Sequence, residues 1–259
     1  IFIFLLIFIF LIVPALISSN KGRQIILSKI NNALTDGKAE ISDLSIGWFK
    51  GLKIADFSYD DNAGWLSVKV KNISTKPSYG SLLTGNFNLG KTEIDSPQIE
   101  IDLNKKPATS TETTPNEPKQ QVATQTAAFA LTTDFNLKDG NIKLIGNDSK
   151  TVELKQINTD INIRPPGEQS KFNLGMVVAA NDVKSPLEVK GEFKPDKKAG
   201  WSMKNADLDI GVNIENFDLE SIEPFLEMAG LEIKTKGSVT VDIQSKVVDG
   251  QLENATGTI

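Results

Sequence analysis

The side chains of this sequence that could do chemistry are carboxylates, hydroxyls and amines, because its 259 residues include neither histidine nor cysteine. The commonest general base and metal ligand is therefore missing. Thiolate catalysis, disulfides and cysteine-type zinc sites are excluded. We expect no catalytic residue, no metal and no cofactor, and we predict that the protein is not an enzyme.

The carboxylates that stand close together have simpler explanations than catalysis. Asp207 and Asp209 are two residues apart on the outer face of a predicted strand, and Glu220 and Glu223 fall in the first turn of a predicted helix, where acids are favoured. The stretch "YDDN" at 59–62 offers oxygen ligands for calcium, but no repeated acidic spacing follows it, which favours a plain turn. The glycine spacing matches no phosphate-binding loop.

Charge and composition exclude further classes. The formal net charge is −5 and the pI is near 5.0, whereas a nucleic-acid-binding domain usually carries a basic face. We therefore expect no nucleic-acid partner. The length suits one large or two smaller domains. The sequence begins with Ile1 and stops within an unfinished pattern, so we expect it to be a piece of a longer chain.

The N-terminal segment predicts a membrane anchor. "IFIFLLIFIFLIVPALI" contains no charged or polar side chain over 17 residues. As a helix it would be roughly 25 Å long, slightly short of the ~30 Å hydrocarbon core. Lys21 and Arg23 follow at once and no A-x-A site is present, which favours an uncleaved anchor over a signal peptide. We assign residues 1–19 to a single-pass transmembrane helix.

The body divides into three regions. Residues 20–103 begin with a short helix capped at Ser19-Asn20 and continue as short runs of alternating apolar and polar residues, which predict strands. Residues 104–128 contain many threonines and prolines and almost no large apolar side chain, so we predict a disordered linker or long loop. Residues 129–259 return to alternating runs, interrupted by one helix, "DLESIEPFLEMAG", with Asp218 as its cap.

Turn signals predict that the strands form antiparallel hairpins. Asp139-Gly140, Asn147-Asp148 and the run 165–167 each separate two alternating stretches. The phase of alternation breaks between Leu52/Ile54 and Phe57/Tyr59, which predicts a β-bulge. A sheet with one apolar face must hide that face. Either a second sheet covers it in a sandwich, the commoner outcome, or the sheet curves so that its apolar face lines a groove.

Four sequence elements in this order resemble the N-terminal region of AsmA-like proteins. The first is the apolar helix followed by "GRQIILSKINNALTDGKAEISDLSIGWFKGLKIADFSYDD", and the second is "YGSLLTGNFNLGKTEIDSPQIEIDLN". The third is "FNLKDGNIKLIGNDSKTVELKQINTDIN", and the fourth is "FDLESIEPFLEMAGLEIKTKGSVTVDI". The positions that match the family's pattern in the second element are Ser81, Leu82, Leu83, Gly85, Ile94, Pro97, Ile99 and Ile101, and those in the third are Asp139, Gly140 and Ile142.

The resemblance implies a fold and a function. AsmA-like proteins belong with the repeating β-groove, bridge-like lipid transfer proteins, which are anchored in the bacterial inner membrane and extend into the periplasm. By this resemblance we expect a mainly β chain with a few short helices, in which a transmembrane helix precedes a long curved antiparallel sheet that forms an apolar groove. The implied function is to bind phospholipid acyl chains and to support lipid transport to the outer membrane. A non-enzymatic assembly or scaffold factor for the envelope, with other envelope proteins as partners, is the alternative.

The alternating apolar residues of the C-terminal region are the candidate groove lining. For each of them an ordinary core position is the competing interpretation. The predicted set is Leu174, Met176, Val178, Leu187, Val189, Phe193, Leu208, Ile210, Val212, Ile214, Leu231, Ile233, Val239, Val241 and Ile243.

Overall fold

The computed structural model describes residues 14–34, 36–83, 86–105, 130–146, 151–180, 183–228, 231 and 233–258. It is mainly β, with few and short helices. The helices are α2 (Asn20–Ala33), α3 (Tyr79–Leu83), the 3-10 helix η2 (Leu219–Ile222) and α4 (Glu223–Met228). The strands are β1 (Lys38–Gly47), β2 (Gly51–Asp60), β3 (Leu66–Thr75), β4 (Phe87–Asp95), β5 (Gln98–Asp102), β6 (Leu131–Ile145), β7 (Thr151–Ile163), β8 (Ser170–Ala180), β9 (Val183–Lys194), β10 (Asp207–Asp218), β11 (Ser238–Val248) and β12 (Gln251–Thr258).

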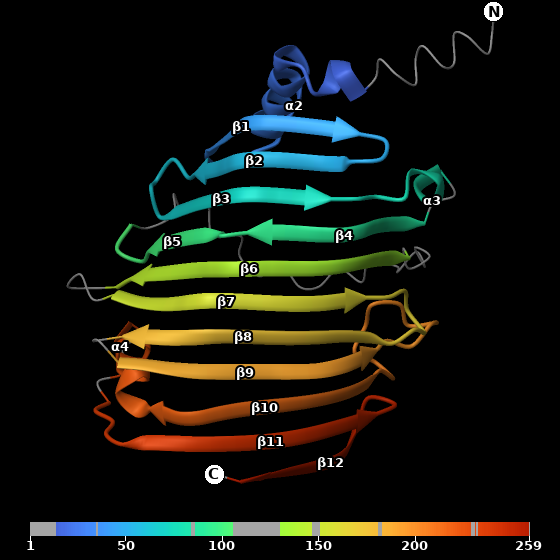
Figure 1. Cartoon of the computed structure of the whole chain (residues 1–259). Coiled ribbons are helices and arrows are strands. Elements are labelled where there is room, and N and C mark those ends of the chain that lie inside the picture. The colour runs from blue at the N-terminus through green and yellow to red at the C-terminus, as the bar shows by residue number, and fades with distance from the viewer. Residues whose placement is uncertain are drawn as a thin grey trace, which may run out of the picture.

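All twelve strands belong to one long sheet, and they follow one another in chain order from β1 at one end to β12 at the other (Figure 1). The described residues contain no second sheet, so the sandwich considered above is wrong. The regions 20–103 and 129–259 both contribute strands to this one sheet. The core is correspondingly thin, and most apolar side chains are half-buried rather than buried.

The sheet is mixed, which corrects the expectation of a purely antiparallel one. β6 runs parallel to both β4 and β5, while the other pairs are antiparallel. β4 and β5 both lie antiparallel to β3, so they act as one strand broken at Ser96-Pro97. Parallel neighbours require a long connection between them. Here that connection is the stretch between β5 and β6, residues 103–130, which includes the predicted linker.

Two strand predictions need correction. Asp139-Gly140 is not a hairpin turn, because β6 continues through it. The strand predicted to begin at Leu231 begins seven residues later, because β11 starts only at Ser238. Thr235 forms its hydrogen bonds with the preceding helical segment instead, donating its hydroxyl to the carbonyl of Leu219 over 2.7 Å and its N–H to Glu223 over 2.5 Å.

Helix α2 and the segment formed by η2 and α4 occupy predicted positions, and the N-terminal caps of α2 and η2 are confirmed, whereas the sequence predicts no helix at α3. The Ser19 side chain accepts a hydrogen bond from Gly22 at the start of α2, and Asp218 accepts one from Glu220 at the start of η2. Residues 1–13 of the predicted anchor, residues 106–128 of the predicted linker and the Asn147-Asp148 signal lie outside the described residues. Among the residues that the structure does describe, no helix combines the length and the apolarity needed to cross a bilayer.

A line of unusual backbone conformations crosses the first part of the sheet. Asp56 in β2, Ser96 between β4 and β5, Asp139 in β6 and Gln156 in β7 have φ angles of 46° to 53°, which residues other than glycine rarely adopt. In the sequence, Asp56, Ser96 and Asp139 each come directly after a residue of one lateral row, in which residues of neighbouring strands pair with one another. That row is Ala55, Asn72, Asp95 and Lys138. We call this line the crease.

The crease keeps the apolar side chains on one face of the sheet. In β2 the alternation changes phase at Asp56, as the sequence indicated, but the pairing register with β1 and β3 does not shift, so the expected bulge is absent there. No shift is needed because β1 and β3 change phase at the same level, between Ile41 and Leu44 and between Val70 and Ile73.

Gln156 provides a test of the strain in the crease. Its side chain is exposed, so Gln156→Gly removes the cost of a left-handed non-glycine residue. We expect this variant to raise the free energy of unfolding by about 0.5–1 kcal/mol, measured by urea denaturation. The matched variant Glu188→Gly, at a regular exposed position of β9, should lower it by up to about 1 kcal/mol. If both variants lower the free energy of unfolding by the same amount, the backbone of the crease is unstrained.

Candidate functional site

The candidate site is the apolar face of the sheet, because residues that pair directly across neighbouring strands point to the same side. The predicted residues of β8 to β11 form two complete lateral rows. Leu174 pairs with Val189, Val189 with Val212, and Val212 with Ile243. The second row is Met176, Leu187, Ile214 and Val241. The structure therefore brings these predicted residues together on one face.

The first of these rows continues to the other end of the sheet, where it runs alongside the crease. Leu174 pairs with Thr159, which pairs with Leu137 of β6. Through the parallel junction, Leu137 pairs with Ile94 of β4. We call the full series the apolar row. Its members are Leu44, Ile54, Ile73, Ile94, Leu137, Thr159, Leu174, Val189, Val212 and Ile243, one from each strand of the path except β12.

The remaining predicted residues fall in different environments. Phe193 pairs with Leu208, and Ile210 and Val239 also lie on the apolar face. Val178 is buried and therefore closed to a ligand. Leu231 and Ile233 are 48% and 47% exposed in the connection before β11, so they are not part of the face. No lateral row includes them, because this connection bonds to η2 and α4 rather than to a strand, and their role as lining residues stays a prediction.

Sequence reasoning missed the first half of the apolar row. Ile54, Ile73, Ile94 and Leu137 have the same alternation as the predicted residues, but the predicted set begins only at Leu174. The signal that could have found them is the apolar alternation on both sides of each phase break. Most members of the row are half-buried, because lateral neighbours cover their sides while the described residues form no second layer over them.

One lateral margin of the face is covered by η2 and α4, which contact β7, β8 and β9. Under this cover Ser185 and Ser221 are fully buried, with 3.0 Å between their hydroxyl oxygens. Ser185 also accepts a hydrogen bond of 2.9 Å from the N–H of Asp218. The N–H of Thr235 and the Lys234 ammonium hold the pKa of Glu223 below its ordinary value and fasten α4 to the following segment.

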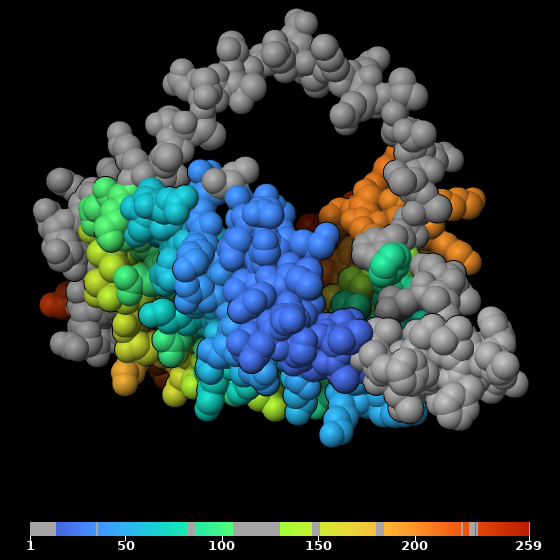
Figure 2. Space-filling model, turned by 90° about the horizontal axis from the view of Figure 1, so that it is seen from above, coloured from blue at the N-terminus to red at the C-terminus, as the bar shows by residue number. Residues whose placement is uncertain are grey.

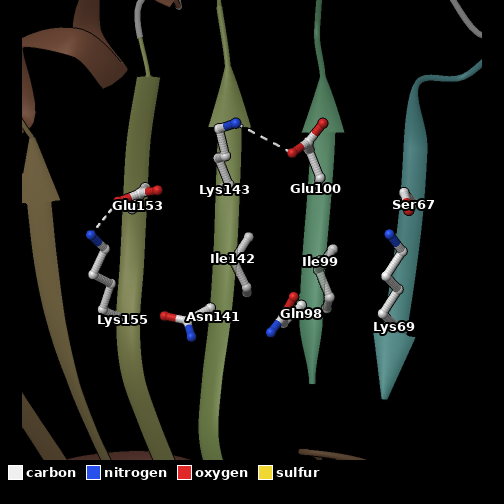
Figure 3. A pocket seen from close by; sticks show the side chains of 10 residues that line it. All are labelled: Ser67, Lys69, Gln98, Ile99, Glu100, Asn141, Ile142, Lys143, Glu153 and Lys155. Atoms are coloured by element: carbon white, nitrogen blue, oxygen red, sulfur yellow. Dashed lines mark hydrogen bonds and ion pairs between the residues drawn. The ribbon is translucent and has the colours of Figure 1, made fainter. Parts of the chain in front are cut away.

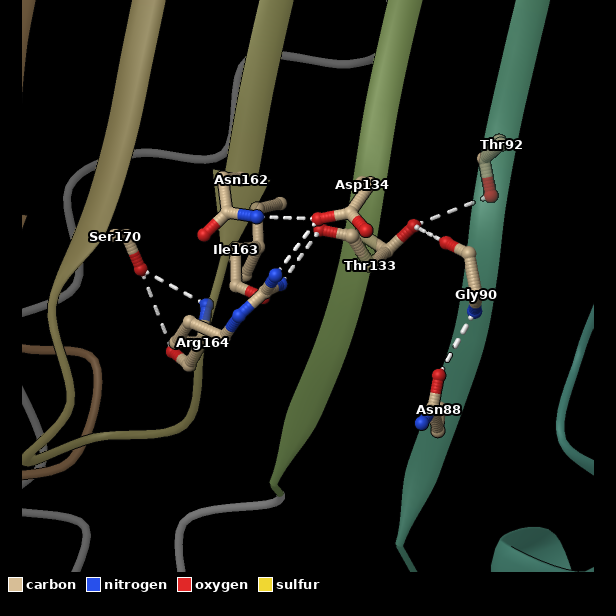
Figure 4. A network of polar contacts seen from close by, with 9 residues as sticks. All are labelled: Asn88, Gly90, Thr92, Thr133, Asp134, Asn162, Ile163, Arg164 and Ser170. Atoms are coloured by element: carbon tan, nitrogen blue, oxygen red, sulfur yellow. Dashed lines mark hydrogen bonds and ion pairs between the residues drawn. The ribbon is translucent and has the colours of Figure 1, made fainter.

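The opposite margin is formed by a polar network at the parallel junction (Figure 4). The Thr133 hydroxyl lies 2.9 Å from the carbonyl oxygen of Gly90 and 3.2 Å from the hydroxyl of Thr92. Arg164 donates to the carbonyl oxygen of Thr133 over 3.4 Å and forms an ion pair of 2.8 Å with Asp134. Because these groups bond to one another, we interpret the network as structural contacts that hold β4, β6 and β7 together.

The outer face has the opposite chemistry. Figure 3 shows a shallow pocket over β3, β5, β6 and β7 in which Lys143 pairs with Glu100 and Lys155 with Glu153. Asp209 belongs to this face and Asp207 lies 3.9 Å from Lys194. No cluster of acidic residues suited to a metal ion occurs in the described part of the chain. Seen from the α2 end, Figure 2 shows a hollow between α2 and the orange segment near residue 200.

Comparisons with family models, with curated proteins and with solved structures found no match to this chain.

Proposed function

We propose that this protein binds phospholipid acyl chains along its apolar face and supports lipid transport from the inner to the outer bacterial membrane. In this proposal residues 1–19 anchor the chain in the inner membrane and the sheet lies in the periplasm. The observation that carries the proposal is the apolar row, which extends over ten strands and is half-exposed or exposed on the nine strands from Ile54 to Ile243, while Leu44 is buried. The resemblance to AsmA-like proteins points the same way.

The length of the row supports a conduit rather than a site for one lipid. Neighbouring strands lie about 4.8 Å apart, so the nine strands from Ile54 to Ile243 extend over roughly 38 Å. The hydrocarbon layer of one leaflet is about 15 Å deep, half of the bilayer core. A methylene group removed from water is stabilised by about 0.8 kcal/mol. A row of this length, interrupted only by Thr159, can therefore keep an acyl chain out of water over most of its passage, and no catalytic group is needed.

The alternation within β10 gives the experiment. A photoreactive amino acid at Val212 would stand on the apolar face, and one at Asn213 would stand on the outer face. After irradiation of cells, we expect phospholipid attached to the protein with the probe at Val212 and not with the probe at Asn213. Equal labelling at both positions, or none at Val212, would contradict lipid binding on this face.

An envelope scaffold is the second candidate, and one observation favours it. Strand β12 is exposed along its whole length and pairs only with β11 among the described strands. An edge of this kind can accept a further strand, either from a longer form of this chain or from another protein. The same experiment separates the two functions, because a scaffold predicts that a probe at Val212 reaches no lipid and that a probe on β12 is attached to protein.

A further inference from the structure

The charge of the first 35 residues differs from that of the rest of the chain. They contain Lys21, Arg23 and Lys29 and no acidic residue, whereas residues 36–259 carry the other 25 Lys and Arg and all 33 Asp and Glu. All three cations belong to α2. The helix is thus a positive element at the end of an otherwise acidic protein.

The exposed face of α2 alternates cations with an apolar side chain. Lys21, Ile25 and Lys29 are four residues apart, so they stand one above the other on one side of the helix. All three are exposed, and Ile25 is 60% exposed. Leu16, just before α2, is 61% exposed, and Phe49, at the tip of the β1–β2 hairpin, is 89% exposed. We call Leu16, Lys21, Ile25, Lys29 and Phe49 the basal surface.

The basal surface is held in a fixed orientation relative to the sheet. Ser18 bonds to both the N–H and the carbonyl of Ile46, at 2.8 and 3.3 Å. Asn31 bonds in the same way to the N–H and the carbonyl of Ala39, at 2.7 and 2.9 Å. These side chains clamp α2 and the turn before it against the edge of β1. Figure 1 shows the result, with α2 lying across the β1 end of the sheet.

The corner between the chain before α2 and α2 itself is also tight. A Cβ atom at Gly22 would lie only 2.3 Å from the carbonyl oxygen of Leu16 and 2.5 Å from that of Ile17. Only glycine allows this approach without displacing backbone. The direction in which the chain meets α2 is therefore fixed by packing.

We infer that the basal surface docks on the head-group layer of a membrane that contains anionic lipids. A helix that combines exposed cations with exposed apolar side chains lies in the interface, with its apolar groups among the acyl chains and its cations at the lipid phosphates. Because α2 is clamped to β1, this docking would place Leu44, the first member of the apolar row, next to the membrane. The inference goes beyond the proposed function, since it holds whether or not the apolar face carries lipid.

Charge favours a membrane over a second copy of the chain. A two-fold contact of basal surfaces would bring two sets of cations together with no acidic residue of 14–34 to compensate them. Anionic lipids offer the complementary charge at high density.

The test uses the full chain, which has no cysteine and so accepts single labels cleanly. Ser28→Cys lies on the exposed side of α2, beside Ile25 and Lys29, and replaces no member of the basal surface, while Thr256→Cys lies on β12 at the far end of the sheet. Each is labelled with a nitrobenzoxadiazole dye and reconstituted in vesicles of phosphatidylcholine, with or without phosphatidylglycerol. We expect a rise in fluorescence, and quenching by nitroxide-labelled lipid, only at position 28 and only with phosphatidylglycerol.

Variants that neutralise the α2 lysines measure how much their charge contributes to docking. A cation near an anionic surface contributes about a five-fold factor to binding, so Lys21→Gln with Lys29→Gln should lower the ratio of docked to undocked protein about thirty-fold. The control pair Lys204→Gln with Lys236→Gln removes the same charge from exposed positions elsewhere and should leave that ratio unchanged. Three outcomes would overturn the inference. Docking could be equal with and without phosphatidylglycerol, or it could persist after both α2 lysines are replaced. It could also increase with protein concentration, as contact with a second copy of the chain would require.

Discussion

Leu174→Asp is expected to abolish the labelling of phospholipid by a photoreactive probe at Val212 while leaving labelling by a probe at Ile73 intact. Leu174 lies in β8, between the β3 and β10 positions of the apolar row. An ionised carboxylate among acyl chains costs several kcal/mol. That cost exceeds what a few methylene groups gain from the face at about 0.8 kcal/mol each. If lipid reaches the face from the α2 end, the charge blocks passage beyond β8 only.

The control for this variant stands on the opposite face of the same strand. Asn173→Asp introduces the same charge between Asp160 and Lys190, its paired neighbours, so attraction and repulsion there nearly offset each other. Lipid labelling at Val212 should match that of the parent protein. Leu174 is half-buried, so its aspartate can reach water in the lipid-free protein, and circular dichroism should show an intact sheet. Persistent labelling at Val212 in folded Leu174→Asp would rule out a continuous conduit, and loss at both positions would rule out access from the α2 end.

The local structure of this protein could be predicted from its sequence, because alternation and capping are local properties. Strands β7 to β10 and the helical segment capped by Asp218 agree with the prediction. Asp139-Gly140 shows where local reasoning fails. The pair is a strong hairpin signal, yet Asp139 adopts its positive φ inside β6, where the sheet changes phase beside Ser96. Only the neighbouring strands distinguish a turn from a crease.

Pairing over long distances could not be predicted. Ile94 and Leu137 look like two unrelated strand residues, one on each side of the threonine-rich segment, and their partnership depends on the parallel return of the chain. Without that pair the apolar row would appear as two separate faces. The strand predicted to begin at Leu231 fails for a similar reason, because its alternation is real but the segment bonds to η2 and α4. Candidate lining residues are therefore predictable by type, whereas their continuity is a property of register.

The second large effect is expected at the buried pair under η2. Ser185→Ala removes the acceptor of the Asp218 N–H and the partner of the Ser221 hydroxyl. Leaving a buried polar group without its partner costs about 1–3 kcal/mol, and Ser221 is fully buried. We expect hydrogen exchange in residues 219–228 to accelerate about 30- to 150-fold, corresponding to about 2–3 kcal/mol for the two orphaned groups.

The companion variants separate this bond from a general loss of packing. Ser221→Ala keeps the bond between Ser185 and Asp218, so its effect should be about 1 kcal/mol, a five-fold change in exchange. The double variant should cost less than Ser185→Ala alone, because the Ser221 hydroxyl that the single variant orphans is then absent and only the Asp218 N–H lacks its acceptor. Effects that simply add would show that the two hydroxyls act independently.

If the two hydroxyls are coupled, release of η2 and α4 uncovers Val178 and widens the apolar face at β8. The same Ser185→Ala variant should then also gain lipid labelling by a photoreactive probe placed at Val178.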